Sequence, residues 1–296
     1  MKRPNFFIVG APKSGTTALA DYLRQHPDVF MPLRKELGFF GSDLKYTKRF
    51  LRPRNDSEYL RHFGQWRDEA CAGEASVWYL FSTRAAAEIK NFSPSAKIIV
   101  MCRNPVEVMY SNYYQLLYSG NETLPSFEQA LAAEPMRRRG AQIPPTAMLA
   151  DALRYRDSVR FAGQLERYFN VFGRESVHTI IFDDFASDTA QEFRAVLEFM
   201  QIESEFRTEF RRVNPNKTPR GTFVWRLLRT TPLMAAARRF PRFAHRVYSP
   251  IRRLNTVVVE RPPLDEKLER SLKNEMRPEI DRLGELLGRD LSHWYS

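Results

Sequence analysis

Near the start of the chain the sequence reads Gly10-Ala11-Pro12-Lys13-Ser14-Gly15-Thr16-Thr17, between an apolar run at 6–9 and a helical pattern that begins at Thr17. A loop that joins a buried strand to a helix directs backbone N–H groups and the positive end of the helix dipole at one place, where an anion binds. Its two glycines and Thr17 fit the spacing G-x-x-x-x-G-K-[ST] of phosphate-binding loops, but Thr16 stands in the place of the lysine. Lys13 is the nearest lysine. The loop therefore predicts a phosphate site that departs from the triphosphate-binding pattern.

Apolar runs and helical patterns alternate along the rest of the chain. We expect strands at 6–9, 29–31, 97–102 and 177–182, and helices at 17–24, 106–117, 158–172 and 189–200, with more helical periodicity at 262–294. Strands that alternate with helices indicate βαβ units. The predicted fold class is therefore α/β, with a P-loop-type parallel sheet flanked by helices.

The composition is that of a folded globular protein, with 296 residues of which 43% are hydrophobic and 27% charged. The two cysteines, Cys71 and Cys102, exclude a disulfide framework and a cysteine-built zinc site. No stretch approaches the roughly 18 apolar residues of a membrane span, and the first residues lack the pattern of a signal peptide. We therefore expect a cytoplasmic protein. The net charge of +11 points to anionic ligands.

Basic residues gather late in the chain, with 13 Lys and Arg against one acidic residue between 207 and 253. We expect a single domain over 1–296 that carries a basic, proline-interrupted helical cap at about 207–261. The cap fits a solvated basic face, an electrostatic funnel for an anionic acceptor, or peripheral contact with an acidic membrane surface. Nucleic-acid binding is not expected, because no recognition motif accompanies the charge.

A second site of the same kind follows the strand expected at 97–102. Arg103 stands at its carboxyl end, and Ser111 lies eight residues later on the next expected helix. A guanidinium in this place can bind a phosphate bidentately, and a hydroxyl two turns along the helix adds a hydrogen bond.

Together the loop and the Arg103–Ser111 pattern closely resemble the donor-binding motifs of sulfotransferases, whose donor is 3′-phosphoadenosine 5′-phosphosulfate (PAPS). The resemblance implies that Lys13, Ser14, Gly15, Thr16 and Thr17 bind the 5′-phosphosulfate, and that Arg103 and Ser111 bind the 3′-phosphate. A looser match at 214–221 implies that Lys217 and Arg220 close over the nucleotide. Segments 73–80, 182–185 and 288–294 also resemble the family, and the similarity is greatest to its bacterial and carbohydrate-modifying group, which includes the heparan sulfate enzymes.

The segment 34–40 resembles one in the carbohydrate-modifying group in which a glutamate before a Phe-Phe pair is the general base. Glu36 occupies that place, and apolar neighbours would raise its proton affinity toward the useful range. Lys13 would stabilise the leaving phosphate oxygen. A solvated glutamate paired with Lys35 is the alternative. The other branch of the family uses a histidine, but His26, His178, His245 and His293 have structural or solvated settings, and His62 stays undecided.

We therefore interpret the chain as an enzyme that moves a sulfuryl group from PAPS to a carbohydrate or glycolipid, with PAP as product. A hydroxyl is the first choice of acceptor group and an amine the second. The resemblance implies no catalytic metal. Ala75 and Gly38 depart from the glucosamine-modifying relatives, which leaves the acceptor open. One alternative is a P-loop kinase or nucleoside triphosphatase, in which Asp183 at the end of a strand would hold magnesium. A catalytically silent anion-binding protein is the other.

Overall fold

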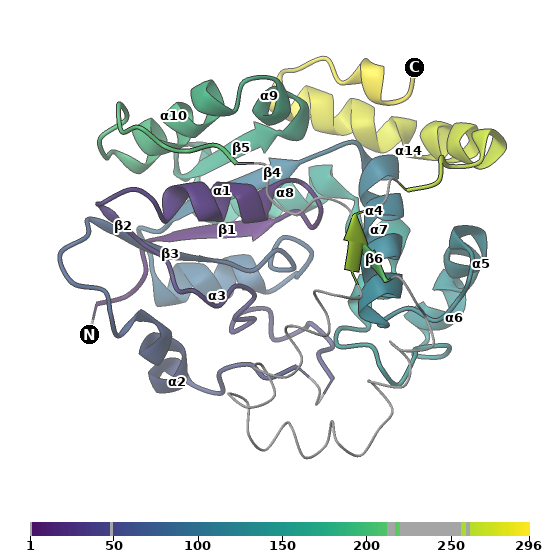
Figure 1. The fold of residues 1–296 in the computed structure, drawn as a ribbon, viewed down its shortest axis with the longest axis horizontal. Helices are drawn as coiled ribbons and strands as arrows, with labels where there is room; N and C mark the ends of the chain where they lie inside the picture. The colour runs from purple at the N-terminus through teal and green to yellow at the C-terminus, as the bar shows by residue number, and fades with distance from the viewer. Residues whose placement is uncertain (1, 48–49, 212–216, 220–255, 259–260) are drawn as a thin grey trace. The chain divides into compact units, whose positions relative to one another are not determined.

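A five-stranded sheet forms the centre of the protein, with the strand order β2-β3-β1-β4-β5 and every neighbouring pair parallel (Figure 1). The computed structural model describes residues 2–47, 50–211 and 261–296, together with the backbone of 217–219 and 256–258. The strands are β1 (Phe6–Gly10), β2 (Val29–Phe30), β3 (Cys71–Ala75), β4 (Lys97–Cys102) and β5 (Val177–Ile181). The predicted fold class, a parallel α/β sheet flanked by helices, is confirmed.

The central strand β1 places the phosphate loop. It lies between β3 and β4, with Phe6 opposite both Gly73 and Lys97, and all five of its residues are buried. A continuous apolar run of this kind is typical of a parallel strand that helices cover on both faces. Because the carboxyl ends of parallel strands meet at one edge of a sheet, the segments that follow β1, β3 and β4 start from the same edge.

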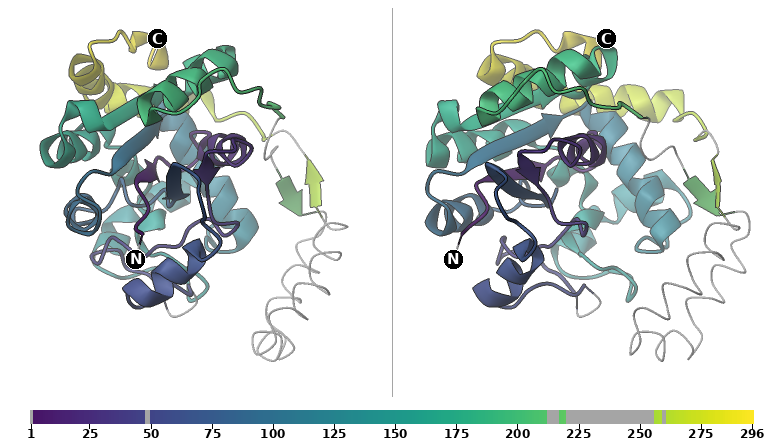
Figure 2. Two further views of the ribbon diagram at one scale, coloured as in Figure 1. Left: turned by 90° about the vertical axis from the view of Figure 1, so that its left-hand side faces the viewer. Right: turned by 60° about the vertical axis from the view of Figure 1, so that its left-hand side comes forward.

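Helices cover the sheet (Figures 1 and 2). The helix α1 (Thr16–Leu23) contacts β1 and β3, whereas α8 (Phe161–Phe172) contacts β4 and β5. Two further helices, α3 (Ala85–Phe92) and α14 (Glu266–Leu287), pack on α8, and α14 also packs on α4 (Pro105–Ser119). The other α-helices of the described residues are α2 (Asp56–Leu60), α5 (Phe127–Ala132), α6 (Glu134–Arg138), α7 (Tyr155–Ser158), α9 (Phe182–Ser187) and α10 (Thr189–Met200).

Two sequence-based expectations about elements were wrong in part, and one strand was missed. The strand β3 was not predicted at all. The helix expected at 158–172 begins only at Phe161. The helix α7 ends at Ser158, and the two residues between the helices are not helical. Phe182 does not end β5 but is the first residue of α9. A large apolar residue fits either element, so its apolar character did not distinguish them.

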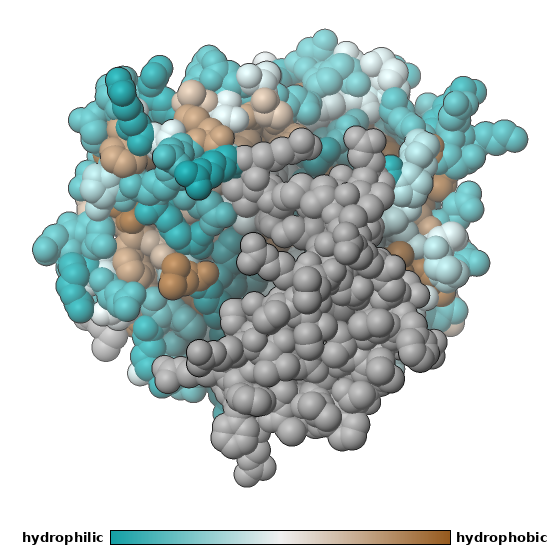
Figure 3. Space-filling view, viewed as in Figure 1, coloured by the Kyte–Doolittle hydropathy of each residue, from teal (hydrophilic) through white to brown (hydrophobic). Residues whose placement is uncertain are grey.

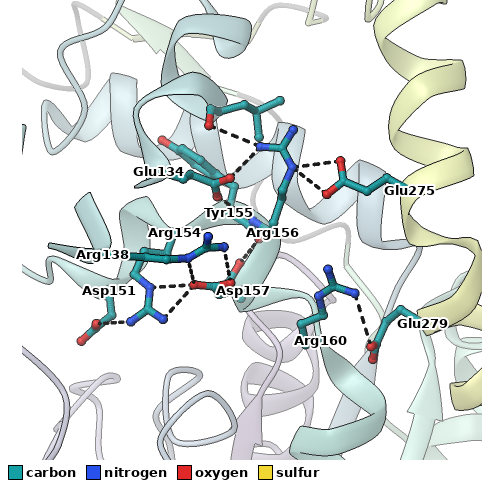
Figure 4. A network of polar contacts seen from close by, with 12 residues as sticks. Glu134, Arg138, Asp151, Arg154, Tyr155, Arg156, Asp157, Arg160, Glu275 and Glu279 are labelled. Carbon is teal, nitrogen blue, oxygen red and sulfur yellow. Dashed lines mark hydrogen bonds and ion pairs between the residues drawn. The ribbon is translucent and has the colours of Figure 1, made fainter. Parts of the chain in front are cut away.

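A network of ion pairs joins α14 to the segment that precedes α8 (Figure 4). The Arg156 guanidinium lies 2.6 Å from the nearly buried carboxylate of Glu134 and 2.8 Å from Glu275 of α14. Beside it, Asp157 accepts hydrogen bonds from Arg138 and Arg154. These contacts fix α7 between α6 and the long C-terminal helix, and α4 packs on both α7 and α14.

The chain forms two compact units, one of 1–211 with 264–296 and the other of 212–263. In the second unit β6 (Lys217–Pro219) pairs antiparallel with β7 (Thr256–Val258). Most of the helical cap expected at 207–261 lies outside the described residues, and the single domain stays a prediction.

Hydrophilic residues predominate on the face shown in Figure 3, and apolar residues lie between them in separate patches. Among the described residues, Leu33 and Leu51 are the most exposed of the large apolar side chains, with 92% and 76% of their area accessible. Over the described ranges, none of the helices combines the length and the apolar character needed to span a bilayer.

Gly73 is required where β3 passes β1. A Cβ atom added at this position would lie 2.3 Å from the backbone oxygen of Phe6, which cannot move without disturbing the central strand. We expect Gly73→Ala to lower the free energy of unfolding by about 1–3 kcal/mol, as overpacking of a core does. Gly163→Ala in α8 is the matched control, because its Cβ would have no neighbour within 4 Å. Urea denaturation checks both, and equal stability of the two variants would contradict the assignment.

Candidate active site

The loop between β1 and α1 presents backbone N–H donors at the start of a helix. Gly15 occupies the N-cap position of α1 with φ 92°. No side chain caps this helix, and its first turn contains no acidic residue. Lys13 also has a left-handed φ of 65°. The loop is anchored to the neighbouring strand, because the Ala11 N–H donates to the carbonyl of Met101 at 2.7 Å. A helix start without an acidic side chain attracts an anion.

Two buried serine hydroxyls, one in the phosphate loop and one on α4, have no hydrogen-bond partner among the described residues. Ser14 belongs to the loop and is fully buried, and Ser111 on α4 is 1% exposed. Burying a hydroxyl without a partner costs free energy, so such groups in a folded protein call for a ligand or another explanation. Both residues were predicted from the sequence to bind the same anionic ligand, and both fit phosphate oxygens as acceptors of their protons.

Arg103 connects the two predicted anion-binding segments. Its Nη1 donates to the backbone oxygen of Lys13 at 3.3 Å, and its guanidinium lies 4.4 Å from the centre of the Phe182 ring. Its Nε donates to Glu107, one turn along α4, at 2.8 Å. The arginine that follows β4 therefore touches the loop that follows β1, and a ligand held by one segment lies within reach of the other.

Glu36 lies in a loop that follows β2 and is half-buried with a left-handed φ of 57°. Its backbone N–H donates to the oxygen of Ala75 at 3.0 Å, and its Oε2 accepts from the N–H of Val77 at 3.1 Å. Burial raises the pKa of the Glu36 carboxyl, and the neighbouring Lys35 ammonium and the Val77 N–H oppose that rise. The carboxyl therefore holds a proton more tightly than an exposed glutamate does.

Two side chains that the sequence did not assign to the donor site, Lys35 and Gln115, contact residues of the phosphate loop. The Lys35 Nζ donates to the hydroxyl of Thr17 at 2.9 Å, which links the Glu36 loop to the start of α1, and burial lowers the pKa of this ammonium. The Lys13 Nζ donates to Gln115 on α4 at 3.4 Å. Gln115 stands four residues after Ser111 and so shares its helix face, a spacing that the sequence did contain.

Three of the four described histidines contact residues outside the predicted site. His26 Nε2 contacts the carbonyl of Glu203 at 2.8 Å, His178 stacks on Phe199, and His293 pairs with Asp183. Burial and two nearby arginines lower the pKa of His62. His245 and Arg220 lie outside the described residues. Lys217 begins β6, and its side chain likewise lies outside them.

Asp183, the predicted magnesium ligand of the kinase alternative, contacts two residues near the C-terminus, His293 and Trp294. Its Oδ2 accepts from the indole N–H of Trp294 at 2.6 Å and lies 3.1 Å from Nε2 of His293. The neighbouring Asn104, at the start of α4, donates to the backbone oxygen of Trp294 at 2.9 Å. These contacts give the carboxylate a role in fastening the C-terminal turn to the ends of β4 and β5.

Three comparisons with known proteins all find sulfotransferases. The model of the sulfotransferase domain family matches residues 3–218. A crystal structure of a sulfotransferase from Alicyclobacillus acidocaldarius is 31% identical, with a TM-score of 0.75 and full coverage of both chains. Heparan sulfate glucosamine 3-O-sulfotransferase 3B1 of Mus musculus is 30% identical over 67% of this chain and 46% of its own. Carbohydrate sulfotransferase 15 of Mus musculus is 28% identical over 67% of this chain and 44% of its own. The chain thus spans less than half the length of these two relatives.

The raised pKa of Glu36 makes its contribution to stability depend on pH. A carboxyl whose pKa is higher in the folded state stabilises the fold below its unfolded pKa and loses that contribution as pH rises through the folded value. We expect wild type to lose stability relative to Glu36→Gln as the pH rises above the ordinary glutamate pKa of 4.5 and through the raised pKa of the folded state, because glutamine does not ionise. Thermal melts across this range measure the difference in Tm, and a difference that stays constant would show that the pKa is not raised.

Proposed function

Because the chain belongs to the sulfotransferase domain family, we propose that it transfers a sulfuryl group from PAPS to a hydroxyl group of a carbohydrate or glycolipid. The observation that carries the proposal is the pair of unpartnered buried hydroxyls, Ser14 and Ser111, on the two segments that the contact between Arg103 and Lys13 joins. A ligand with one anionic group at each segment satisfies both hydroxyls. PAPS supplies the activated sulfuryl group when it binds.

The donor-binding roles follow from the contacts of each segment. The N–H groups of Gly15, Thr16 and Thr17 start α1 without a capping side chain and would bind the phosphosulfate end. The Lys13 ammonium would neutralise the charge that develops on the leaving phosphate oxygen. Arg103 and the Ser111 hydroxyl would bind the 3′-phosphate, and we assign closure over the nucleotide to Lys217 and Arg220 on the sequence match alone.

Glu36 is the proposed general base. Its Oε atoms accept the proton of the acceptor hydroxyl as the oxygen attacks sulfur, and its raised pKa brings it closer to the pH at which a base works best. Lys35 joins the base to the donor loop, because its backbone is continuous with Glu36 while its ammonium contacts Thr17. A carbohydrate acceptor is supported by the names of two relatives, a heparan sulfate glucosamine enzyme and a carbohydrate sulfotransferase.

Binding of 3′-phosphoadenosine 5′-phosphate (PAP) tests the donor assignment. We expect Arg103→Ala to weaken PAP binding about 10- to 100-fold, because a charge-assisted hydrogen bond contributes about 1.5–3 kcal/mol. Binding of adenosine 5′-phosphate, which lacks the 3′-phosphate, should change little. Titration calorimetry measures both ligands, with the exposed Arg139→Ala as the control variant.

The same titration separates this proposal from the kinase alternative. Wild type should prefer PAP to ATP, and a clear preference for ATP in the presence of magnesium would overturn the sulfotransferase assignment. An equal loss of affinity for PAP and for adenosine 5′-phosphate in Arg103→Ala would show that this arginine does not bind the 3′-phosphate.

Turnover tests the base. With ³⁵S-labelled PAPS and desulfated heparin as acceptor, we expect Glu36→Gln to lower kcat by about 10²- to 10⁴-fold, the usual contribution of a positioned base, while PAP affinity is retained. Wild-type kcat should fall toward acid pH as Glu36 is protonated, with an apparent pKa above that of an exposed glutamate. Loss of PAP binding together with activity would instead assign Glu36 to the donor site.

A further inference from the structure

A second glutamate, Glu74 of β3, is buried behind the loop that carries Glu36, with only 1% of its surface exposed. Three hydroxyl groups donate to its carboxylate. The Tyr59 and Tyr79 hydroxyls lie 3.1 and 2.8 Å from Oε1, and the Ser76 hydroxyl lies 2.8 Å from Oε2. The carboxylate is therefore surrounded by hydrogen-bond donors, which is what an ionised carboxylate requires when it is removed from water.

Two of these hydroxyls also accept hydrogen bonds from the backbone of the Glu36 loop. The N–H of Gly38 donates to the Ser76 hydroxyl at 3.2 Å. The N–H groups of Phe39 and Phe40 both donate to the Tyr79 hydroxyl, at 2.8 and 3.3 Å. Three consecutive backbone donors of the loop thus end on hydroxyls whose own protons point to Glu74.

The directions of these hydrogen bonds follow from what each group can do. A backbone N–H only donates, so each hydroxyl must accept from it and must direct its single proton elsewhere. An ionised carboxylate only accepts, so Glu74 takes those protons and fixes the orientation of both hydroxyls. A group that donated in the place of Glu74 would compete with the backbone for the same oxygens.

We propose that Glu74 is a positioning residue that holds the Glu36 loop in place through the hydroxyls of Ser76 and Tyr79. The inference rests on the proposed role of Glu36 as the base. The loop needs such support, because Glu36 and Gly38 both have a left-handed φ, at 57° and 62°, and a non-glycine residue adopts that conformation at a cost. The hydrogen bonds of the Glu74 carboxylate go to Tyr59, Tyr79 and Ser76, so it acts through the loop and not on the substrate.

Burial and hydrogen bonding have opposite effects on the pKa of the Glu74 carboxyl. Burial raises its pKa to about 7, and the charge of Glu36 adds to the rise, while the hydroxyls of Ser76, Tyr79 and Tyr59 lower it. The ionised form, which the donor pattern fits, is therefore populated at and above neutral pH.

The two tyrosines provide a matched pair of variants. Both are fully buried and both donate to the same oxygen of Glu74, but only Tyr79 accepts from the loop. In the full chain, with and without PAP, we expect Tyr79→Phe to speed amide hydrogen exchange at residues 39 and 40 at least about tenfold, because each amide loses its buried acceptor. Tyr59→Phe should leave the exchange of these two amides within about threefold of wild type.

An equal increase in both variants, or no increase in either, would overturn the proposal. If Tyr79→Phe does not fold, Ser76→Ala is the second variant, and it should speed exchange at residue 38. Glu74→Gln should speed exchange at residue 38 or at residues 39 and 40, because its amide nitrogen would face either the Ser76 or the Tyr79 hydroxyl and donate toward an oxygen that now accepts from the backbone. Unchanged exchange in Glu74→Gln would show that the carboxylate does not fix the hydroxyls.

Kinetics separate a positioning role from a merely structural one. With ³⁵S-labelled PAPS and desulfated heparin, Tyr79→Phe should lower kcat at least about tenfold, since a misplaced base costs about 10²-fold per ångström, while PAP affinity stays within about twofold. Unchanged kcat with faster loop exchange would overturn the positioning role. Failure of wild type to bind PAP would overturn the proposed function, while amide exchange would still decide whether Glu74 holds the loop.

Discussion

The hydrogen bond from the Arg103 guanidinium to the Lys13 carbonyl joins the segments that follow β1 and β4, and the arrangement of the site depends on it. The two strands are neighbours in a parallel sheet, so both segments start from the same edge. The ring of Phe182, at the start of α9, lies beneath the guanidinium and limits the positions that this side chain can take. Arg103 and Lys13, which lie 90 positions apart in the sequence, are thereby held together.

Much of the fold was predictable because local sequence and tertiary structure agree. The strand at 97–102 and the helix at 189–200 have the expected bounds. In each segment the spacing of the apolar residues alone is enough to tell a strand from a helix. The strand β3 was not predicted, because Cys71-Ala72-Gly73-Glu74-Ala75 contains small residues and a charge and no β-branched side chain. Its burial depends on partners elsewhere in the chain, which include the tyrosines that surround Glu74.

Part of the candidate site could likewise be predicted from the sequence, and part of it could not. The phosphate loop and Arg103 follow strands directly, so their place at the edge of the sheet could be predicted from the order of the elements. The contacts of Lys35 with Thr17 and of Lys13 with Gln115 join residues 18 and 102 positions apart, and no local pattern specifies them. The hydroxyls that support residues 38–40 come from the segment after β3, so missing that strand also hid the support of the proposed base.

The position of Lys35 couples the proposed base to the donor loop electrostatically. Its ammonium lowers the pKa of Glu36 and opposes the effect of burial, yet it also contacts Thr17 at the start of α1. An anion bound at that helix start would share the attraction of the same ammonium and reduce its effect on Glu36. The base would then hold a proton more tightly with the donor bound than without it, so donor binding itself would bring Glu36 closer to the proton affinity that proton abstraction requires.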